Sequence, residues 1–261
     1  MNEPQSELME APLLAHFAEL RRRVVLCAGL FLALFCAAYF YAEDIYQFLL
    51  VPLADVLKGE DRRLIYTALT EAFMTYMKVS FFAALFLTFP IMANQIYRFI
   101  APGLYKHEKQ LVMPFFVAVP ALFFMGAAFA YYVLIPFAWK FFVGFETLGG
   151  SGHLAIQLEA RISDYLDLVM QLVMAFGVAF QMPVLLVALI AAGLISSQSL
   201  AKKRRIAIVI IFIIGAILTP PDVLSQISLS LPLCFLYECS IWTGKLIERR
   251  KLRYARHSVD T

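Results

Sequence analysis

The feature that most constrains this chain is a series of long runs without Asp, Glu, Lys or Arg. A helix needs about 20 mostly apolar residues to cross the hydrocarbon core of a bilayer. The runs that reach or approach this length span residues 24–42, 79–97, 110–139 and 168–201. Two shorter apolar segments, 206–218 and 227–244, follow them, and the second is interrupted by Glu238. We therefore predict six transmembrane helices, of which the last two are short.

The composition favours a membrane protein over a soluble globule. Of the 261 residues, 62% are apolar and 16% are charged, whereas soluble domains carry about 25% charged residues. One globule of this size could not hide so much apolar surface. We predict an all-α polytopic membrane protein with a single domain over residues 1–261. Its predicted parts are a cytoplasmic amphipathic arm over 1–23, a six-helix bundle over 24–244 and a basic cytoplasmic tail over 245–261.

Two of the segments indicate where their helices bend or stop. The run 168–201 is longer than a bilayer requires and contains Pro183 and Gly193. We expect one kinked helix and an interfacial turn there rather than two spans. The segment 206–218 precedes Thr-Pro-Pro-Asp, and a helix this short reaches only about 20 Å. This last hairpin should thin the bilayer or border a water-filled concavity.

The distribution of Lys and Arg predicts the orientation, because cytoplasmic loops carry more of them. Along the predicted topology, 16 lie on the side of the two termini and five on the other side, with Lys78 near the start of the second span. We therefore expect both termini in the cytoplasm.

Two acidic residues lie among the basic clusters of the predicted cytoplasmic side. Glu19 is in HFAELRRR, an amphipathic segment expected along the membrane interface, and Glu108 is in YRFIAPGLYKHEK. Each has a structural interpretation, since Glu19 can pair with Arg23 four residues on and Glu108 can stabilise the first turn of a helix. The functional interpretation is that both carboxylates bind guanidinium groups, to which they can offer bidentate hydrogen bonds.

Gln181 and Glu238 are the notable polar residues inside the predicted spans. A buried amide commonly forms an interhelical hydrogen bond, whereas an acid within a span is a functional candidate. An alternative function follows if both line a solute path, namely a small secondary transporter or channel. Internal repeats would favour that alternative, and none is visible. The aromatic residues expected at the membrane interface are Tyr131, Tyr132, Trp139 and Trp242.

Patterns for catalysis or metal binding are absent from the sequence. The four His residues are scattered, and there is no Ser-His-Asp set, HExxH motif or glycine-rich phosphate loop. The net charge of +3 is dispersed, which argues against a nucleic-acid partner. We expect a protein that is not an enzyme and that has no catalytic residue, metal or cofactor.

Several stretches occur in the order in which the TatC family has them. They are HFAELRRR at 16–23, the loop at Pro52, TEAFMTYMKV at 70–79, YRFIAPGLYKHEK at 97–109, GAAFAYYVLIP at 126–136, AFGVAFQMPV at 175–184 and LTPPDVLSQ at 218–226. The chain resembles this family over residues 12–245, most specifically at IAPGLYKHE and TPPD. TatC is the core membrane subunit of the twin-arginine protein translocase.

The resemblance implies a bacterial cytoplasmic-membrane protein that recognises twin-arginine signal peptides and exports folded proteins with the proton-motive force. It also implies single-span partners of the TatB and TatA type and a homo-oligomer within a larger complex. The residues that it places on the signal-peptide surface are Glu19, Glu108, Arg21 and Phe99. Pro52, Asp222 and Gln226 match further positions that are functionally sensitive in the family.

Gln181 is a departure from the resemblance, because many members have Glu at this position. An amide can donate and accept hydrogen bonds but cannot ionise. A polar contact with a partner helix or a signal peptide is therefore expected to persist here, whereas a role that needs a charge or a proton is not.

Overall fold

The computed structural model describes residues 4–56, 65, 70–104, 113–144, 161–218 and 223–257, and these are almost entirely helical. The elements are α1 (Pro4–Phe40), α2 (Ala42–Val56), α3 (Glu71–Leu104), α4 (Met113–Phe129), the π-helical segment η2 (Ala130–Leu134), α5 (Ile135–Val143), α6 (Ile162–Ala179), α7 (Met182–Ala191), α8 (Ser197–Lys202), α9 (Arg204–Leu218) and α10 (Val223–His257). Within these ranges the only β pairing is an isolated bridge between Ile65 and Arg161. The all-α prediction is confirmed.

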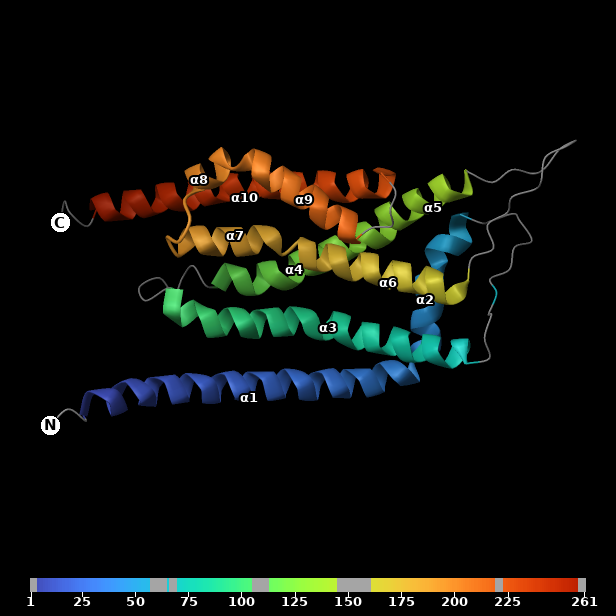
Figure 1. The fold of residues 1–261 in the computed structure, drawn as a ribbon, viewed down its shortest axis with the longest axis horizontal. Helices are drawn as coiled ribbons and strands as arrows, with labels where there is room; N and C mark the ends of the chain where they lie inside the picture. The colour runs from blue at the N-terminus through green and yellow to red at the C-terminus, as the bar shows by residue number, and fades with distance from the viewer. Residues whose placement is uncertain are drawn as a thin grey trace, which may run out of the picture.

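The long helices lie side by side along one axis, with α1 and α10 at opposite edges (Figure 1). The start of α1 and the end of α10 lie at the same end of the bundle, which we call the termini end. The opposite end, where α2 lies, is called the far end. This arrangement agrees with an even number of membrane crossings.

Four helical stretches are long and apolar enough to cross a membrane: Phe17–Phe40, Glu71–Ile96, Phe115–Phe141 and Ile162–Ala191. They correspond to the first four predicted spans. The fifth is α9, with 15 residues. The predicted sixth span lies within α10, which continues as one helix of 35 residues into the basic segment.

The predicted kink and turn in the fourth run are confirmed. Helix α6 ends at Ala179 and α7 begins at Met182, because Pro183 has no N–H to donate to the carbonyl of Ala179. Helix α7 ends at Ala191, and Gly193 follows its cap with a φ of 76° that suits glycine. There the amide of Gly193 donates to the carbonyl of Ile190 at 2.9 Å.

The amphipathic arm differs from the expectation. Residues 4–23 do not turn away along an interface but form one unbroken helix with the first span, as the single ribbon of α1 shows (Figure 1). From Leu13 to Arg23 the sequence contains no glycine or proline, so nothing between the arm and the first span stops the helix. The internal Pro12 lies nearer the N-terminus, within α1.

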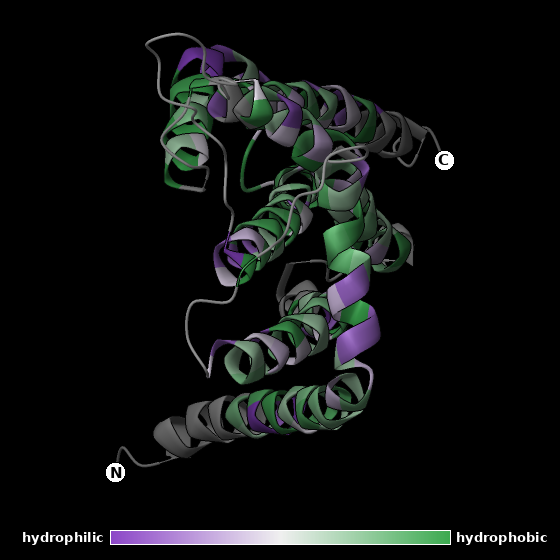
Figure 2. Ribbon diagram, turned by 90° about the vertical axis from the view of Figure 1, so that its right-hand side faces the viewer, coloured by the Kyte–Doolittle hydropathy of each residue, from purple (hydrophilic) through white to green (hydrophobic). Residues whose placement is uncertain are grey.

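Much of the apolar surface faces outward. In Figure 2 hydrophobic residues lie along most helices rather than on one inner face, and Leu185, Ile213 and Phe235 are more than half exposed. Among the residues whose burial is described, no charged side chain is buried. A lipid-facing belt with an uncharged interior is what a membrane requires.

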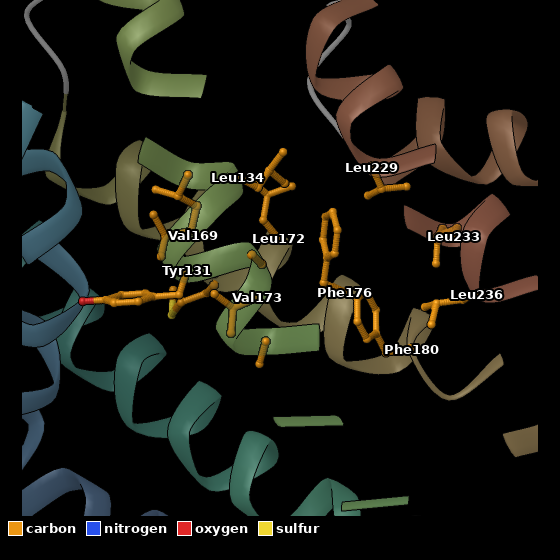
Figure 3. Close-up of a cluster of buried hydrophobic side chains, with 14 of the residues drawn as sticks. Tyr131, Leu134, Val169, Leu172, Val173, Phe176, Phe180, Leu229, Leu233 and Leu236 are labelled. Atoms are coloured by element: carbon orange, nitrogen blue, oxygen red, sulfur yellow. The ribbon is translucent and has the colours of Figure 1, made fainter. Parts of the chain in front are cut away.

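The core is organised around α6. Its side chains Val169, Leu172, Val173 and Phe176 lie between η2 on one side and α10 on the other (Figure 3). The partners include Tyr131 and Leu134 of η2 and Leu229, Leu233 and Leu236 of α10. Helix α6 therefore fixes the positions of the surrounding helices.

Candidate functional site

The contact between α1 and α3 at the termini end brings polar groups together. Arg23 donates to Glu19 Oε1 from Nε at 3.1 Å and from Nη2 at 2.5 Å. Its Nη1 donates to the side-chain oxygen of Gln95 on α3 at 2.9 Å and to the Gln95 carbonyl at 3.2 Å. The predicted pairing of Glu19 with Arg23 is confirmed, and the second half of the contact, on α3, was not predicted.

The register of this contact places the predicted site residues. Helices α1 and α3 are antiparallel neighbours (Figure 1), and Arg23 meets Gln95. One turn further toward the termini end on each helix lie positions 19 and 99, so Glu19 is level with the backbone of Phe99. Arg21 is exposed on α1. The side chain of Phe99 and the whole of Glu108 lie outside the described residues.

Helix α3 is also attached to α4 near this end. The Arg98 guanidinium lies 4.5 Å from the centre of the Phe116 ring, a distance at which a cation is attracted to an aromatic face. The Asn94 amide donates to the Phe116 carbonyl at 3.4 Å. These contacts position the end of α3 from which the segment with Glu108 continues.

A second polar cluster at the termini end ties α8 and α9 to α10. Arg204 donates to Glu238 from Nε at 2.6 Å and from Nη2 at 3.0 Å. Tyr237 donates to the carbonyl of Leu200 at 2.9 Å, and the backbone amide of Ser197 donates to Glu248 at 2.8 Å. Three side chains of α10 thus hold the basic connection that leads into α9.

Glu238 is therefore not an isolated acid deep within a span. Its side chain is 43% exposed, and its partner Arg204 is 44% exposed. The sequence places Glu238 among apolar neighbours, but the pairing depends on how α9 folds back against α10. This tertiary contact brings the acid to the level of the basic residues that start α9.

At the far end, Pro52 explains a second unpredicted contact. Pro52 lies inside α2 and not in a loop, so the predicted loop there is wrong. It has no N–H, and the carbonyl of Phe48, four residues earlier, therefore receives no helical hydrogen bond from it. The hydroxyl of Tyr131 donates to this carbonyl at 2.5 Å. Tyr165 donates similarly to the carbonyl of Leu49 at 2.8 Å. Pro52 itself is buried, and the two tyrosines fasten α2 to η2 and α6.

Two of the four aromatic residues predicted to form the interface belt are instead buried within the bundle. Tyr131 and Trp139 are buried, at 6% and 7% exposure, and Tyr165 packs on Trp139. Tyr132 and Trp242 are exposed, at 68% and 71%. Pro52 was the sequence feature that could have indicated the buried contact of Tyr131. A proline leaves the carbonyl four residues earlier without its helical hydrogen bond, and inside a membrane protein that carbonyl needs another donor.

The two glutamines of the predicted site both make backbone contacts between helices. Gln181, between α6 and α7, donates to the carbonyl of Val119 on α4 at 3.0 Å, as the structural interpretation predicts. Gln226 on α10 donates to the carbonyl of Phe212 on α9 at 3.0 Å. Asp222 lies outside the described residues.

Two cavities border α6. One of about 500 Å³ lies between α1, α3 and α6, and one of about 540 Å³ lies between α6, α7, α9 and α10. Met174 and Gln171 line both cavities, and Gln181 lines neither. Lys78 and Asp167, paired at 2.6 Å, line the first. The remaining walls are mostly apolar, so these hollows suit apolar occupants.

The chemistry available at the α1–α3 contact is the binding of cations. A half-exposed carboxylate already accepts two N–H groups from a guanidinium there, which demonstrates the geometry for this ligand class. Within the described part of the chain, no three His, Cys, Asp or Glu residues gather where they could hold a metal ion.

Comparisons with known proteins place the chain among membrane translocase subunits. The family model described as TatC, Sec-independent protein translocase protein, matches residues 15–232. The chain is 44% identical to the Sec-independent protein translocase protein TatC of Magnetococcus marinus, over 96% of this chain and 93% of that one. It is 38% identical to the protein of the same name from Escherichia coli, over 90% and 88%. A crystal structure of the twin-arginine translocase receptor TatC superposes with a TM-score of 0.75 at 37% identity, covering 89% of this chain and 99% of that one.

Proposed function

Because the chain belongs to the TatC family of Sec-independent protein translocase proteins, we propose that it is the subunit that binds twin-arginine signal peptides. Membership makes it a multi-pass component of a protein translocase, so the transporter or channel alternative is set aside. In this proposal it forms the core through which folded precursors are exported, as a binding and conducting subunit rather than an enzyme.

The observation that carries the proposal is the guanidinium contact of Glu19. The carboxylate sits on α1, level with position 99 of α3, and its side chain is 49% exposed. A signal-peptide arginine that reaches the membrane surface presents the same planar group that Arg23 presents now. Glu108 supplies the second carboxylate, and Arg21 and Phe99 complete the surface.

The remaining predicted residues have supporting roles in this proposal. Pro52 positions the far end of the bundle and Gln226 joins α10 to α9, while Asp222 is a further functional residue in the TPPD sequence. Gln181 joins α4 to the kink between α6 and α7, and Glu238 orients the basic connection before α9. The complex contains TatB-type and TatA-type single-span partners and further copies of this chain, and the proton-motive force drives export.

The proposal places the protein in the bacterial cytoplasmic membrane with its termini end in the cytoplasm. Single cysteines at Ser199 and Tyr254 should then react with an impermeant reagent only from the cytoplasmic side. Cysteines at Gly59 and Gly150 should react from outside. Labelling of position 254 from outside would contradict both the orientation and the number of spans.

Direct binding of a twin-arginine signal peptide to the purified protein tests the receptor role. Glu19→Gln and Glu108→Gln should each weaken binding by about 1 to 3 kcal/mol, the range for hydrogen bonds to charged groups. The matched control is Glu43→Gln, an exposed acid at the start of α2 at the far end, which should leave binding unchanged. Replacing the peptide's Arg pair by Lys should weaken its binding to the parent protein more than its binding to either site variant. Parental affinity in both site variants would refute the proposed role of these carboxylates.

A further inference from the structure

The carboxylate proposed to bind the signal peptide is already occupied. Both Nε and Nη2 of Arg23 donate to the same oxygen of Glu19, Oε1. The other oxygen, Oε2, accepts no hydrogen bond from the described part of the chain. Glu19 is thus half engaged by an internal guanidinium, the same chemical group that a twin-arginine ligand carries.

Arg23 is anchored independently of Glu19. Its Nη1 donates to both oxygens of Gln95, the side-chain one at 2.9 Å and the backbone one at 3.2 Å. The Arg23 side chain is 22% exposed, against 49% for Glu19. If Glu19 turned toward another partner, the guanidinium would keep two of its four hydrogen bonds and would stay on α3.

We propose that Arg23 is an affinity-determining residue that competes with the arginines of the ligand for Glu19. This inference rests on the proposed function. An incoming guanidinium first meets the free Oε2 and then takes Oε1 from Arg23, which remains bonded to Gln95. No bond other than hydrogen bonds forms or breaks, and no proton is transferred.

A competitor of this kind should lower the affinity for the ligand, and the change should be moderate. An exposed pair four residues apart on a helix is weak, so Arg23 lowers ligand affinity by a small factor. It also keeps the carboxylate directed toward α3 in the absence of ligand. Peptides whose positive charges are scattered should therefore bind Glu19 less well than a twin-arginine peptide, whose two guanidinium groups can displace Arg23.

The test compares Arg23→Gln with Arg22→Gln in the full-length protein, using a fluorescent twin-arginine signal peptide. Both variants lose one positive charge from the same helical turn, but Arg22 is exposed and makes no hydrogen bond to Glu19. Arg23→Gln should bind the peptide roughly twofold to fivefold more tightly than the parent, the strength of an exposed ion pair. Arg22→Gln should change the affinity less, because exposed charges beyond direct contact are screened by salt.

A double-substitution cycle then assigns the effect to Glu19. In the Glu19→Gln background, Arg23→Gln should not change the affinity further, because position 19 then carries no carboxylate for Arg23 and the ligand to compete for. If Arg23→Gln raised the peptide affinity equally in the parent and in the Glu19→Gln variant, the cause would be a general charge effect and the proposal would be overturned. Equal gains from Arg22→Gln and Arg23→Gln would also overturn it.

Two further results separate this inference from the receptor role. If Glu19→Gln weakens binding but Arg23→Gln does not strengthen it, the competitor is refuted and the receptor role stands. If Glu19→Gln has no effect, both are refuted. Should Arg23→Gln fail to accumulate, Arg23→Lys provides the same test, because an ammonium cannot span Glu19 and both oxygens of Gln95. An affinity no higher than that of the parent would then overturn the proposal.

Discussion

The α4–α6 contact and the α1–α3 contact join helices in opposite ways. At Gly126 of α4 an added Cβ would lie 2.6 Å from the carbonyl oxygen of Phe176, and at Gly177 of α6 it would lie 2.7 Å from the Phe123 ring. At Gly29 of α1 nothing lies within 4 Å. About half of the α6–α7 span is buried, against 6% of the α1 span. The first contact is tight and apolar where the glycines cross. The second is open at Gly29 and combines the Phe31–Phe81 ring contact with the polar bridge from Arg23 to Gln95.

This difference explains where a binding residue can be placed. Tight glycine crossings inside the bundle leave no room for a charged side chain or for a ligand. The α1–α3 edge has free space and a half-exposed carboxylate, so its polar groups can exchange partners without repacking the core. Substitutions should therefore reduce stability at the α4–α6 contact and change binding at the α1–α3 contact.

The largest expected effect is at the glycine crossing. Gly126→Ala should lower the free energy of unfolding by about 1 to 3 kcal/mol, because the added methyl group meets backbone and the Phe180 side chain rather than a flexible chain end. Thermal unfolding in detergent measures the change. Gly29→Ala is the matched control and should leave the melting temperature unchanged or raise it. Equal losses at the two glycines would contradict the comparison.

Removal of the Tyr131 hydroxyl should cost less. Tyr131→Phe leaves the Phe48 carbonyl without a donor from either Pro52 or Tyr131, at about 1 to 2 kcal/mol for a buried acceptor. Tyr132→Phe is the control, since that ring is 68% exposed. In a Pro52→Ala background the restored amide can donate to the same carbonyl, so Tyr131→Phe should destabilise less there. If the effects of Pro52→Ala and Tyr131→Phe on the free energy of unfolding simply add in the double variant, this account of Pro52 is ruled out.

A smaller loss is expected at Gln181. Gln181→Leu removes the hydrogen bond to the Val119 carbonyl, and such interhelical bonds are worth about 0.6 kcal/mol on average in membranes. Chemical denaturation in mixed micelles should detect the change. Leu185→Ala, one turn along α7 and 60% exposed, serves as control for the lipid-facing side. If Gln181→Leu lowered the free energy of unfolding more than Gly126→Ala does, Gln181 would do more than join helices.

The smallest stability effect is expected at the exposed pair of Arg204 and Glu238. Glu238→Gln removes a charge from a pair that water and headgroups can solvate, so the melting temperature should not change measurably. If unfolding shifts as much as for Tyr131→Phe, the pair is more than a surface contact.

The spans were predictable because a membrane excludes unpaired charge, so the charge-free runs mark the helices directly. The kink was predictable because Pro183 lacks an amide. The partners of Arg23, Glu238 and Tyr131 on other helices were not, since each depends on the register between helices distant in sequence. Of the candidate site, only the Glu19–Arg23 pair followed from spacing, because both residues lie on one helix.

Photocrosslinking from α1 to a twin-arginine precursor tests the central claim most directly. Phe17 and Phe40 are both exposed aromatics, at 67% and 84%, near the two ends of the apolar part of α1. A photoreactive phenylalanine at position 17, within one helical turn of Glu19, should crosslink to the signal peptide, and this crosslink should disappear when the Arg pair is changed to Lys. The same probe at position 40 should give no crosslink at the binding stage. Crosslinking from position 40 alone, or from position 17 regardless of the Arg pair, would contradict recognition at the α1–α3 contact.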